Sequence, residues 1–340
     1  MKVFVYEYFT GGGTYALAEA SENGPECCLT GEGAAMVTAL AADLQAIPGT
    51  EVVTLRDARL PDQLAWAGTP LRIASARQER EVFRELARHC EATIIIAPEQ
   101  KQALLERTRQ AEAVGARLLS PHSEFVAIAS DKNRTADVLG RHGVRVPPGI
   151  AVQPGAELPA DFRYPAVLKP ADGAGSVGVQ RLAGPTSPYD AAVLGSSARL
   201  ETWCPGVAAS IAVLCGPGGP QPLPACLQRL DEADLRYLGG AGPIQGPLAR
   251  RARRLALAAL AGLPATVGYV GIDLVLGSAA DGSADVVIEI NPRLTTSYVG
   301  LRQLLQTNLA AAMLATAAGR ASEWSFARPH VEFTADGRIL

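Results

Sequence analysis

The sequence predicts an α/β protein in which an open parallel α/β domain comes first and a mixed α+β part follows. Over residues 1–119, short apolar runs of the kind that parallel sheets bury alternate with amphipathic helical patterns. Beyond residue 119, strand patterns come in pairs joined by glycine-rich turns, which is typical of antiparallel hairpins. The length of 340 residues suggests two or three domains.

The first part of the chain opens with a strand pattern at residues 2–6, followed by Gly11, Gly12 and Gly13. Glycines after a strand of an α/β sheet lie where ligands approach, although a flexible turn uses the same residues. Further strands are expected from runs of β-branched residues, and helices from apolar residues at helical spacing. The expected ranges are strands 51–55, 93–97 and 117–119 and helices 32–47, 77–90 and 99–114.

A helix is expected to begin within residues 130–136, where Ser130 or Asp131 can cap it. Lys132 then lies at a helix start, where the dipole disfavours a cation unless an anion is near. A solvated surface lysine is the alternative. Pro147 and Pro148 then break the chain, which is consistent with a hinge.

Residues 167–182 predict two strands joined by a glycine-rich loop. Lys169 lies on the first strand, and Gly173, Gly175 and Gly178 follow it. The dinucleotide fingerprint does not apply, because no helix follows these glycines. Such a loop can instead bring backbone N–H groups close to nucleotide phosphates while the lysine supplies charge. A mobile hairpin tip is the alternative.

The most informative stretch is a hairpin of two apolar strand patterns, 270–276 and 286–290, joined by a turn-rich segment. In this hairpin Asp273 falls opposite Glu289, and Asn291 shares the face of Glu289. Like charges opposite each other destabilise a sheet, unless a divalent cation that prefers oxygen ligands lies between them. A strand with one exposed face is the alternative.

Three other segments complete the chain. Residues 199–214 predict a short strand, a Pro-Gly turn and a second strand, and residues 246–262 and 302–318 predict helices. Arginines near the start of the first of these helices are expected to form a solvated face. They are Arg250, Arg251, Arg253 and Arg254.

The composition excludes several function classes. A net charge of −3 argues against a nucleic-acid surface. The chain lacks the run of about 18 apolar residues that a membrane span needs. We find no signal-peptide pattern, and the six cysteines form no Cys-x-x-Cys pair. A cytoplasmic protein with reduced thiols is therefore expected, and Cys204 is expected to be an apolar filler.

Taken in order, these motifs resemble the ATP-grasp superfamily of carboxylate–amine ligases. The resemblance implies an ATP-grasp fold, in which a nucleotide is held between two α+β subdomains, with ATP and Mg²⁺ (or Mn²⁺) bound. It implies an N-terminal domain at 1–119, a first ATP-grasp subdomain at 120–204 with a lid from about residue 146, and a C-terminal subdomain at 205–340. The matching residues are Lys132, Lys169, the glycine loop, Glu201, Asp273 and the run Glu289-x-Asn291-Pro292-Arg293.

The same resemblance assigns a role to each polar residue. Arg293 and Lys169 would be catalytic, and the segment from Glu201 to Trp203 would be the hinge beside the adenine. Ala208 stands where many family members carry an acidic residue near the ribose, which puts the ribose contact in doubt. The metal ligands would be Asp273, Glu289 and Asn291, and the nucleotide-binding residues Lys132, Lys169, Asp172, Gly173, Gly175, Ser176, Gly178, Glu201, Thr202 and Trp203.

Three stretches, residues 6–13, 130–134 and 289–298, are similar to the tyramine–L-glutamate ligases of methanofuran biosynthesis. This similarity implies that the side-chain carboxylate of glutamate is joined to tyramine, giving γ-glutamyltyramine. Small-molecule substrates are expected, without nucleic-acid or membrane partners, and the sequence allows a homodimer. Candidate substrate residues are Glu7, Tyr8, Thr10, Gly12, Arg293, Thr295, Thr296 and Ser297.

Two other functions fit the same residues. The first is amino-acid or dipeptide ligation with other substrates, as in other ATP-grasp enzymes. The second is a regulatory protein that binds nucleotide without catalysis. Intact Asp273, Glu289, Asn291 and Arg293 argue against the second.

Overall fold

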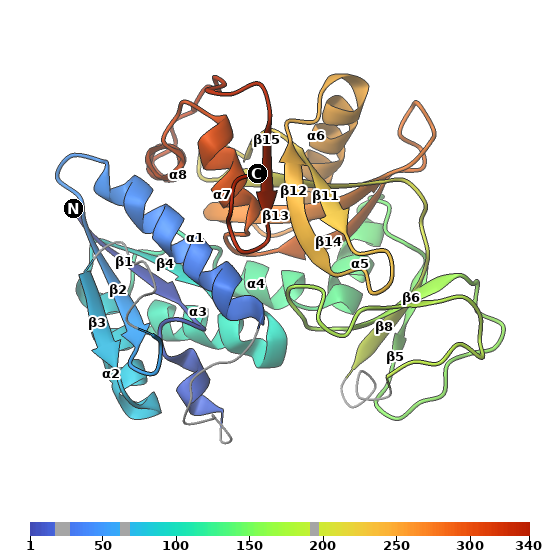
Figure 1. The fold of residues 1–340 in the computed structure, drawn as a ribbon, viewed down its shortest axis with the longest axis horizontal. Coiled ribbons are helices and arrows are strands. Elements are labelled where there is room, and N and C mark those ends of the chain that lie inside the picture. The colour runs from blue at the N-terminus through green and yellow to red at the C-terminus, as the bar shows by residue number, and fades with distance from the viewer. Residues whose placement is uncertain (18–27, 62–68, 191–196) are drawn as a thin grey trace.

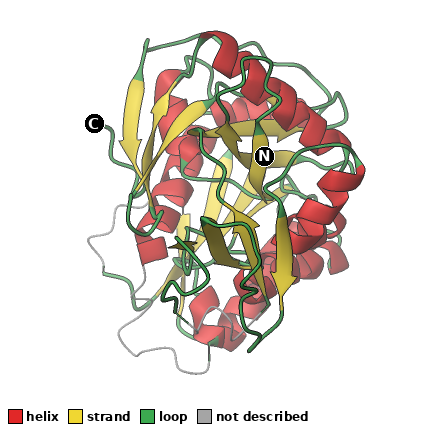
Figure 2. Ribbon diagram, turned by 90° about the vertical axis from the view of Figure 1, so that its right-hand side faces the viewer, coloured by secondary structure: helices red, strands yellow, loops and turns green. Residues whose placement is uncertain are grey.

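The structure, a computed structural model, describes residues 1–17, 28–61, 69–190 and 197–340. Three sheets organise these residues, with helices packed against two of them (Figure 1). Figure 2 shows how strands and helices pack through the depth of the molecule. The expected α/β class, with a parallel sheet first and antiparallel sheets after it, is confirmed.

The first sheet is parallel and has the strand order β3-β2-β1-β4. The alternation of strand and helix in the sequence produces it, as expected. The edge strand β3 was not predicted, because its five residues include Pro70, which usually argues against a strand. The expected strand at 117–119 is a single bridge between Thr93 and Leu118. The elements are β1 (Lys2–Glu7), a short 3-10 helix η1 (Gly13–Ala16), α1 (Cys28–Gln45), β2 (Glu51–Asp57), β3 (Thr69–Ile73), α2 (Ala76–His89), β4 (Ala92–Ile96), a short 3-10 helix η2 (Gln100–Gln102) and α3 (Ala103–Ala113).

Two short helices follow, α4 (Ser123–Ala129) and α5 (Lys132–Arg141). The side chain of Asp131 caps α5 by accepting hydrogen bonds from the backbone N–H groups of Asn133 (2.9 Å) and Arg134 (3.1 Å). The cap fixes Lys132 as the first residue of the helix.

A small antiparallel sheet of order β5-β8-β6-β7, here called the lid sheet, comes next. It lies at the lower right of Figure 1. Its own apolar core includes Val152, Leu168 and Leu200, so it packs as a separate layer. The strands are β5 (Gly149–Val152), β6 (Ala166–Pro170), β7 (Gln180–Leu182) and β8 (Ala198–Thr202).

The third sheet has seven strands in the order β14-β13-β9-β11-β12-β15, with β10 beside β9. The central hairpin pairs as predicted, with Asp273 opposite Glu289. A bulge leaves Ile288 unpaired in this ladder. The strands are β9 (Val207–Cys215), β10 (Gln221–Pro222), β11 (Cys226–Leu230), β12 (Tyr237–Gly242), β13 (Gly268–Leu276), β14 (Val286–Asn291) and β15 (Val331–Thr334).

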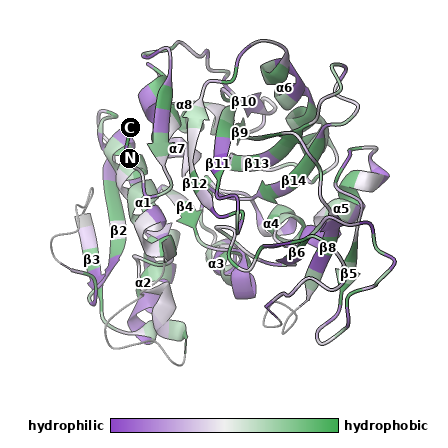
Figure 3. Cartoon of the chain, turned by 45° about the vertical axis from the view of Figure 1, so that its right-hand side comes forward, coloured by the Kyte–Doolittle hydropathy of each residue, from purple (hydrophilic) through white to green (hydrophobic). Residues whose placement is uncertain are grey.

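Helices cover both faces of this sheet. Helix α6 (Gly246–Ala261) packs against β9, β13 and β14, while α7 (Ser297–Leu304) and α8 (Leu309–Ala317) fill the space toward α1. The apolar side chains of β13 and β14 supply much of this core, and Figure 3 colours these strands as hydrophobic. No helix among the described residues is long and apolar enough to cross a bilayer.

Two expectations for this part are wrong. The helix predicted at 302–318 is two helices, because Asn308 caps α8 by accepting a hydrogen bond from the Ala311 N–H (2.9 Å). The arginine run of α6 is not uniformly solvated. Arg251 is buried and pairs with the buried carboxylate of Asp285, so it anchors the helix to the β13–β14 hairpin.

Candidate active site

A cavity of about 240 Å³ lies between the lid sheet and the seven-stranded sheet. The lid sheet and its glycine loop supply one wall, and β9, β11, β13 and β14 supply the other. The N-terminal parts of α1 and α5 also reach it, through Glu32 and Lys132. Residues from distant parts of the sequence therefore share one chamber.

The hairpin places its polar side chains on the cavity wall. Asp273, Glu289 and Asn291 all line it. The Asn291 side-chain amide donates to Asp273 Oδ2 (3.1 Å), and Gln228 donates to Asp273 Oδ1 (2.9 Å). Burial, together with the charge of Glu289, raises the pKa of Asp273 to about 7. Two carboxylates thus face each other across the hairpin at the cavity wall.

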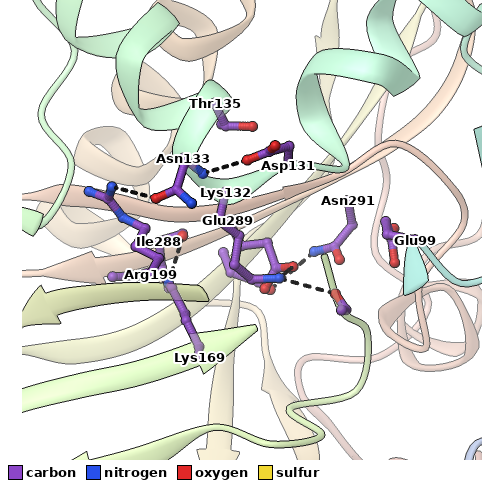
Figure 4. A network of polar contacts seen from close by, with 12 residues as sticks. Glu99, Asp131, Lys132, Asn133, Thr135, Lys169, Arg199, Ile288, Glu289 and Asn291 are labelled. Atoms are coloured by element: carbon purple, nitrogen blue, oxygen red, sulfur yellow. Dashed lines mark hydrogen bonds and ion pairs between the residues drawn. The ribbon is translucent and has the colours of Figure 1, made fainter. Parts of the chain in front are cut away.

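Lys132 meets this carboxylate pair from the start of α5. Its Nζ lies 2.8 Å from Glu289 Oε1 and donates to the carbonyl of Gly173 at 3.2 Å (Figure 4). Burial alone would lower the pKa of Lys132, but Glu289 raises it above its ordinary value. The predicted anion at this helix start is therefore a side chain of the protein itself.

Lys169 belongs to a second buried ionic cluster, on the lid sheet. Its Nζ lies 2.5 Å from Glu201 Oε1, and the other carboxylate oxygen accepts from Arg199 Nε (3.1 Å). Lys169 also donates to the carbonyl of Ile288 (3.4 Å), which the bulge in β14 leaves unpaired. Glu201, predicted beside the adenine, therefore positions Lys169 in this structure.

Arg293 is held by a residue of the parallel-sheet region. Its guanidinium donates from Nε and Nη2 to the two carboxylate oxygens of Glu99, at 2.9 and 3.1 Å. The Glu99 side chain is only 2% exposed, so this two-bond, charge-assisted pair holds the guanidinium in a fixed orientation. Burial alone would lower the pKa of Arg293, but the Glu99 charge raises it.

Hydroxyl groups form the wall beyond Arg293. Tyr269 shares a hydrogen bond with Ser297 (2.8 Å), and Ser297 shares another with Thr295 (2.9 Å). Thr295, Thr296 and Ser297 line the cavity at the start of α7. Burial raises the pKa of the neighbouring Tyr237 phenol, whose hydroxyl bonds to the Thr296 side chain.

The glycine loop reaches the cavity with its small residues. Gly173, Gly175 and Ser176 line it, and Gly175 and Ser176 have φ values of +64° and +59°. A Cβ on Gly175 would lie 2.4 Å from Leu29 Cδ2, so glycine permits both the turn and the contact with α1. Asp172 lies outside the lining and accepts a hydrogen bond from the Lys101 N–H (2.8 Å).

Two family models match the sequence. One describes the ATP-grasp domain and matches residues 129–297, and the other describes the pre ATP-grasp 3 domain and matches residues 50–126. The chain belongs to the ATP-grasp superfamily. A comparison with curated proteins gives no match.

Several solved structures share this fold over almost the whole chain. A protein from Archaeoglobus fulgidus assigned to the superfamily is 20% identical, with a TM-score of 0.71 and 98% of this chain and 92% of that chain covered. The L-amino acid ligase from Bacillus licheniformis is 16% identical (TM-score 0.69; 97% and 78% covered). The ADP complex of N5-carboxyaminoimidazole synthetase from Staphylococcus aureus is 12% identical (TM-score 0.70; 98% and 81% covered). At these identities the likeness is one of fold.

Most of the sequence-predicted ATP-grasp residues lie together. The cavity is lined by Lys132, Lys169, Gly173, Gly175, Ser176, Glu201, Thr202, Trp203, Asp273, Glu289, Asn291, Arg293, Thr295, Thr296 and Ser297. Asp172 and Gly178 lie outside this lining. Ala208 lines it without a carboxylate, and Ser210 is the next residue on the same face of β9.

The predicted substrate residues of the N-terminal motif lie elsewhere. Glu7, Tyr8, Thr10 and Gly12 are outside the cavity lining. The Glu7 carboxylate is buried and accepts hydrogen bonds from the Thr10 N–H (2.7 Å) and hydroxyl (2.6 Å). Gly33 of α1 packs on this carboxylate, since a Cβ there would lie 2.6 Å from Glu7 Cδ. In this structure the residues of this N-terminal motif form part of the surface on which α1 packs.

Sequence reasoning missed four residues that shape the cavity: Glu32, Glu99, Gln228 and Tyr237. Glu99 follows the buried strand β4, so the rule that ligands gather at the carboxyl ends of parallel strands could have found it. Nothing local distinguishes Glu32 from a surface residue of α1, nor Gln228 from any polar residue of a strand.

Proposed function

We propose that the protein is an ATP-dependent ligase that activates a carboxylate as an acyl phosphate and joins it to an amine. One observation carries this proposal. Two lysines, one arginine and a facing pair of carboxylates line a single cavity, and each cation is held by its own carboxylate partner. Phosphoryl transfer is catalysed mainly by such preorganised charge.

The lid-sheet end of the cavity suits the nucleotide base. Trp203, Thr202 and Val167 line it, and the Arg181 guanidinium stacks over the Trp203 ring at 4.3 Å. Lys132, Lys169 and the glycine loop lie between this end and the carboxylate pair, where the phosphates would bind. Loop backbone N–H groups can approach phosphate because small residues leave space.

The residues fit a divalent cation. Within the described ranges no three His, Cys, Asp or Glu side chains form a metal-binding group, so the oxygen set is Asp273, Glu289 and the Asn291 amide. Their fit rests on the two carboxylates that face each other on the cavity wall, whose repulsion a cation would relieve. When bound, Mg²⁺ would neutralise charge on the transferring phosphate.

The chain's own residues would do the remaining work. Arg293, fixed by Glu99, would orient the substrate carboxylate and the γ-phosphoryl group. The carboxylate oxygen attacks the γ-phosphorus, the bond to ADP breaks, and an acyl phosphate forms. The amine then attacks the acyl carbon, a C–N bond forms, and phosphate leaves with the electron pair. A lid over this cavity would exclude water from the acyl phosphate.

Glutamate and tyramine are the substrates we propose first, on the strength of the three motif stretches. The hydroxyls of Thr295, Thr296 and Ser297, with Tyr237, offer polar and aromatic walls at the Arg293 end. Ligation of other amino acids is the second candidate, and the fold likeness to an L-amino acid ligase favours it. Small molecules are the expected partners in either case.

The test is ADP release from purified protein with ATP, Mg²⁺ or Mn²⁺, L-glutamate and tyramine, with the product weighed by mass spectrometry. ADP should appear only when an acid and an amine are both present. Turnover with another acid–amine pair alone would overturn the substrate assignment. Nucleotide binding without turnover on any pair of a broad panel would overturn the ligase.

A further inference from the structure

Glu32 is a carboxylate in the cavity to which the activation chemistry above gives no role. It lies in the second turn of α1 and lines the cavity. Its position is set by Gly33, which packs on the Glu7 carboxyl at the end of β1. The contact holds the start of α1 over the carboxyl edge of the parallel sheet, so Glu32 is carried by a fixed element.

The other cavity carboxylates already have partners. Glu201 binds Lys169 and Arg199, Glu289 binds Lys132, and Asp273, a proposed cation ligand, accepts hydrogen bonds from Gln228 and Asn291. In the part of the chain that the structure describes, Glu32 makes no hydrogen bond or ion pair. Of the four carboxylates that line the cavity among the described residues, Glu32 is therefore the one left for a cationic group of the substrate.

The surroundings of Glu32 define what such a ligand would be. The charged groups that face it are Arg293, which favours its ionised form, and Asp336, which disfavours it. The Tyr237 phenol lies near it and, with Leu230 and Leu235, gives this end an apolar wall. An acid beside an apolar and aromatic wall suits an ammonium group on an apolar or aromatic body.

We propose that Glu32 binds the ammonium group of the amine substrate and takes its proton before the amine attacks. This inference rests on the proposed ligase function and names its amine as a cationic primary amine with an apolar or aromatic body. An ammonium group has no lone pair, so it cannot attack until one proton leaves. Burial raises the pKa of Glu32 to about 7, which suits a proton acceptor near neutral pH.

The ammonium nitrogen must lose two protons to become the nitrogen of a neutral amide. The ammonium nitrogen gives its first proton to the Glu32 carboxylate and attacks the acyl carbon with the freed electron pair. The bond between the acyl carbon and the phosphate oxygen breaks, and the pair leaves on phosphate. The nitrogen gives its second proton to that phosphate, which leaves a neutral amide. Glu32 returns its proton to water when product departs.

Hydroxylamine separates this inference from the ligase itself, because it is largely uncharged at neutral pH and traps acyl phosphates as hydroxamates. Wild-type protein, Glu32→Gln and Glu32→Asp are given ATP, Mg²⁺ and the L-amino acid that gives the strongest hydroxamate signal, with either hydroxylamine or tyramine. Glu85→Gln, an exposed carboxylate on α2, is the matched control.

In Glu32→Gln the ratio of amide to hydroxamate formation should fall about 100-fold, with a raised KM for tyramine and little change in KM for ATP. Glu32→Asp should recover part of the ratio. As pH falls through about 7, wild-type amide formation should decline, while hydroxamate formation should not decline over the near-neutral range in which hydroxylamine stays largely uncharged. The pH profiles are measured on wild-type protein, so this part of the test does not depend on whether the Glu32 variants fold.

An unchanged ratio in Glu32→Gln, or equal pH profiles for the two nucleophiles, would overturn the role of Glu32. A wild-type protein that forms no hydroxamate with any amino acid would instead overturn the ligase function. The two failures are therefore distinct.

Discussion

Asp273 and Glu289 stand directly opposite each other on β13 and β14, yet they are held differently. Glu289 is paired with the Lys132 ammonium, whereas Asp273 accepts hydrogen bonds from the amides of Gln228 and Asn291. Substitution should therefore change stability in opposite directions at the two positions. Asp273→Asn removes a like charge and should stabilise the metal-free protein by about 1 kcal/mol. Glu289→Gln leaves the Lys132 ammonium without its anion and should destabilise the metal-free protein by about 1–2 kcal/mol.

Both substitutions should lower ATP turnover at least about 100-fold, because both side chains are proposed to hold the cation. Urea unfolding in metal-free buffer and ADP release measure the two effects on the same samples. Asp137→Asn, an exposed carboxylate on α5, is the control and should change neither. Equal losses of stability at positions 273 and 289 would contradict this account of the pair.

The Glu99–Arg293 pair makes a second prediction. Glu99→Gln should cost about 3 kcal/mol of stability, because Arg293 would keep a buried charge without its anion. It should also lower kcat about tenfold with a smaller change in KM for ATP, since a looser guanidinium loses transition-state contacts. Glu106→Gln, exposed on the neighbouring α3, is the control. A change in KM alone would show that Glu99 does not position Arg293.

Glu201 should matter for the stability of the lid sheet before it matters for nucleotide binding. Its carboxylate holds Lys169 and Arg199, both nearly buried, so Glu201→Gln should destabilise the protein by about 3–5 kcal/mol. Adding Lys169→Met to this variant should recover part of the lost stability, because it removes one of the two buried cations that Glu201→Gln leaves without an anion. Thermal unfolding of both variants and of exposed Glu157→Gln measures this. A double variant no more stable than Glu201→Gln would contradict the claim that Glu201 stabilises the buried charge of Lys169.

The buried Glu7 carboxyl should make stability depend on pH. Burial raises its pKa from 4.5 to about 7 despite the hydrogen bonds from Thr10. Between these values the folded state binds more protons than the unfolded state, so the contribution of Glu7 to stability should fall as pH rises and be gone above about pH 7. Relative to Glu7→Gln, wild-type protein should lose about 3 kcal/mol from pH 4.5 to about pH 8. If the free energies of unfolding of the two proteins changed with pH in the same way, a raised pKa for Glu7 would be ruled out.

The sequence predicted the parts of the site that depend on local pattern. The pairing of Asp273 with Glu289 follows from strand alternation around one turn, and the place of Lys132 follows from the Asp131 cap. The sequence could not predict ion pairs between residues that are far apart along the chain. Glu99 lies 194 residues from Arg293, and no local pattern joins them.

Two further misses have different causes. The helix predicted at 302–318 was read as continuous because it is apolar throughout, but Asn308 begins a new helix there. Glu32 looks like an ordinary helix residue until the packing of Gly33 on Glu7 places it at the cavity. A local cap decides the first case, and tertiary contact decides the second.

Oxygen transfer from the acid to phosphate tests the central claim most directly. The acid substrate is labelled with ¹⁸O in its carboxylate, and the inorganic phosphate released with the amide is analysed by mass spectrometry. An acyl phosphate requires that one labelled oxygen moves to phosphate for each amide formed. Amide formation with unlabelled phosphate would contradict activation through an acyl phosphate in this cavity.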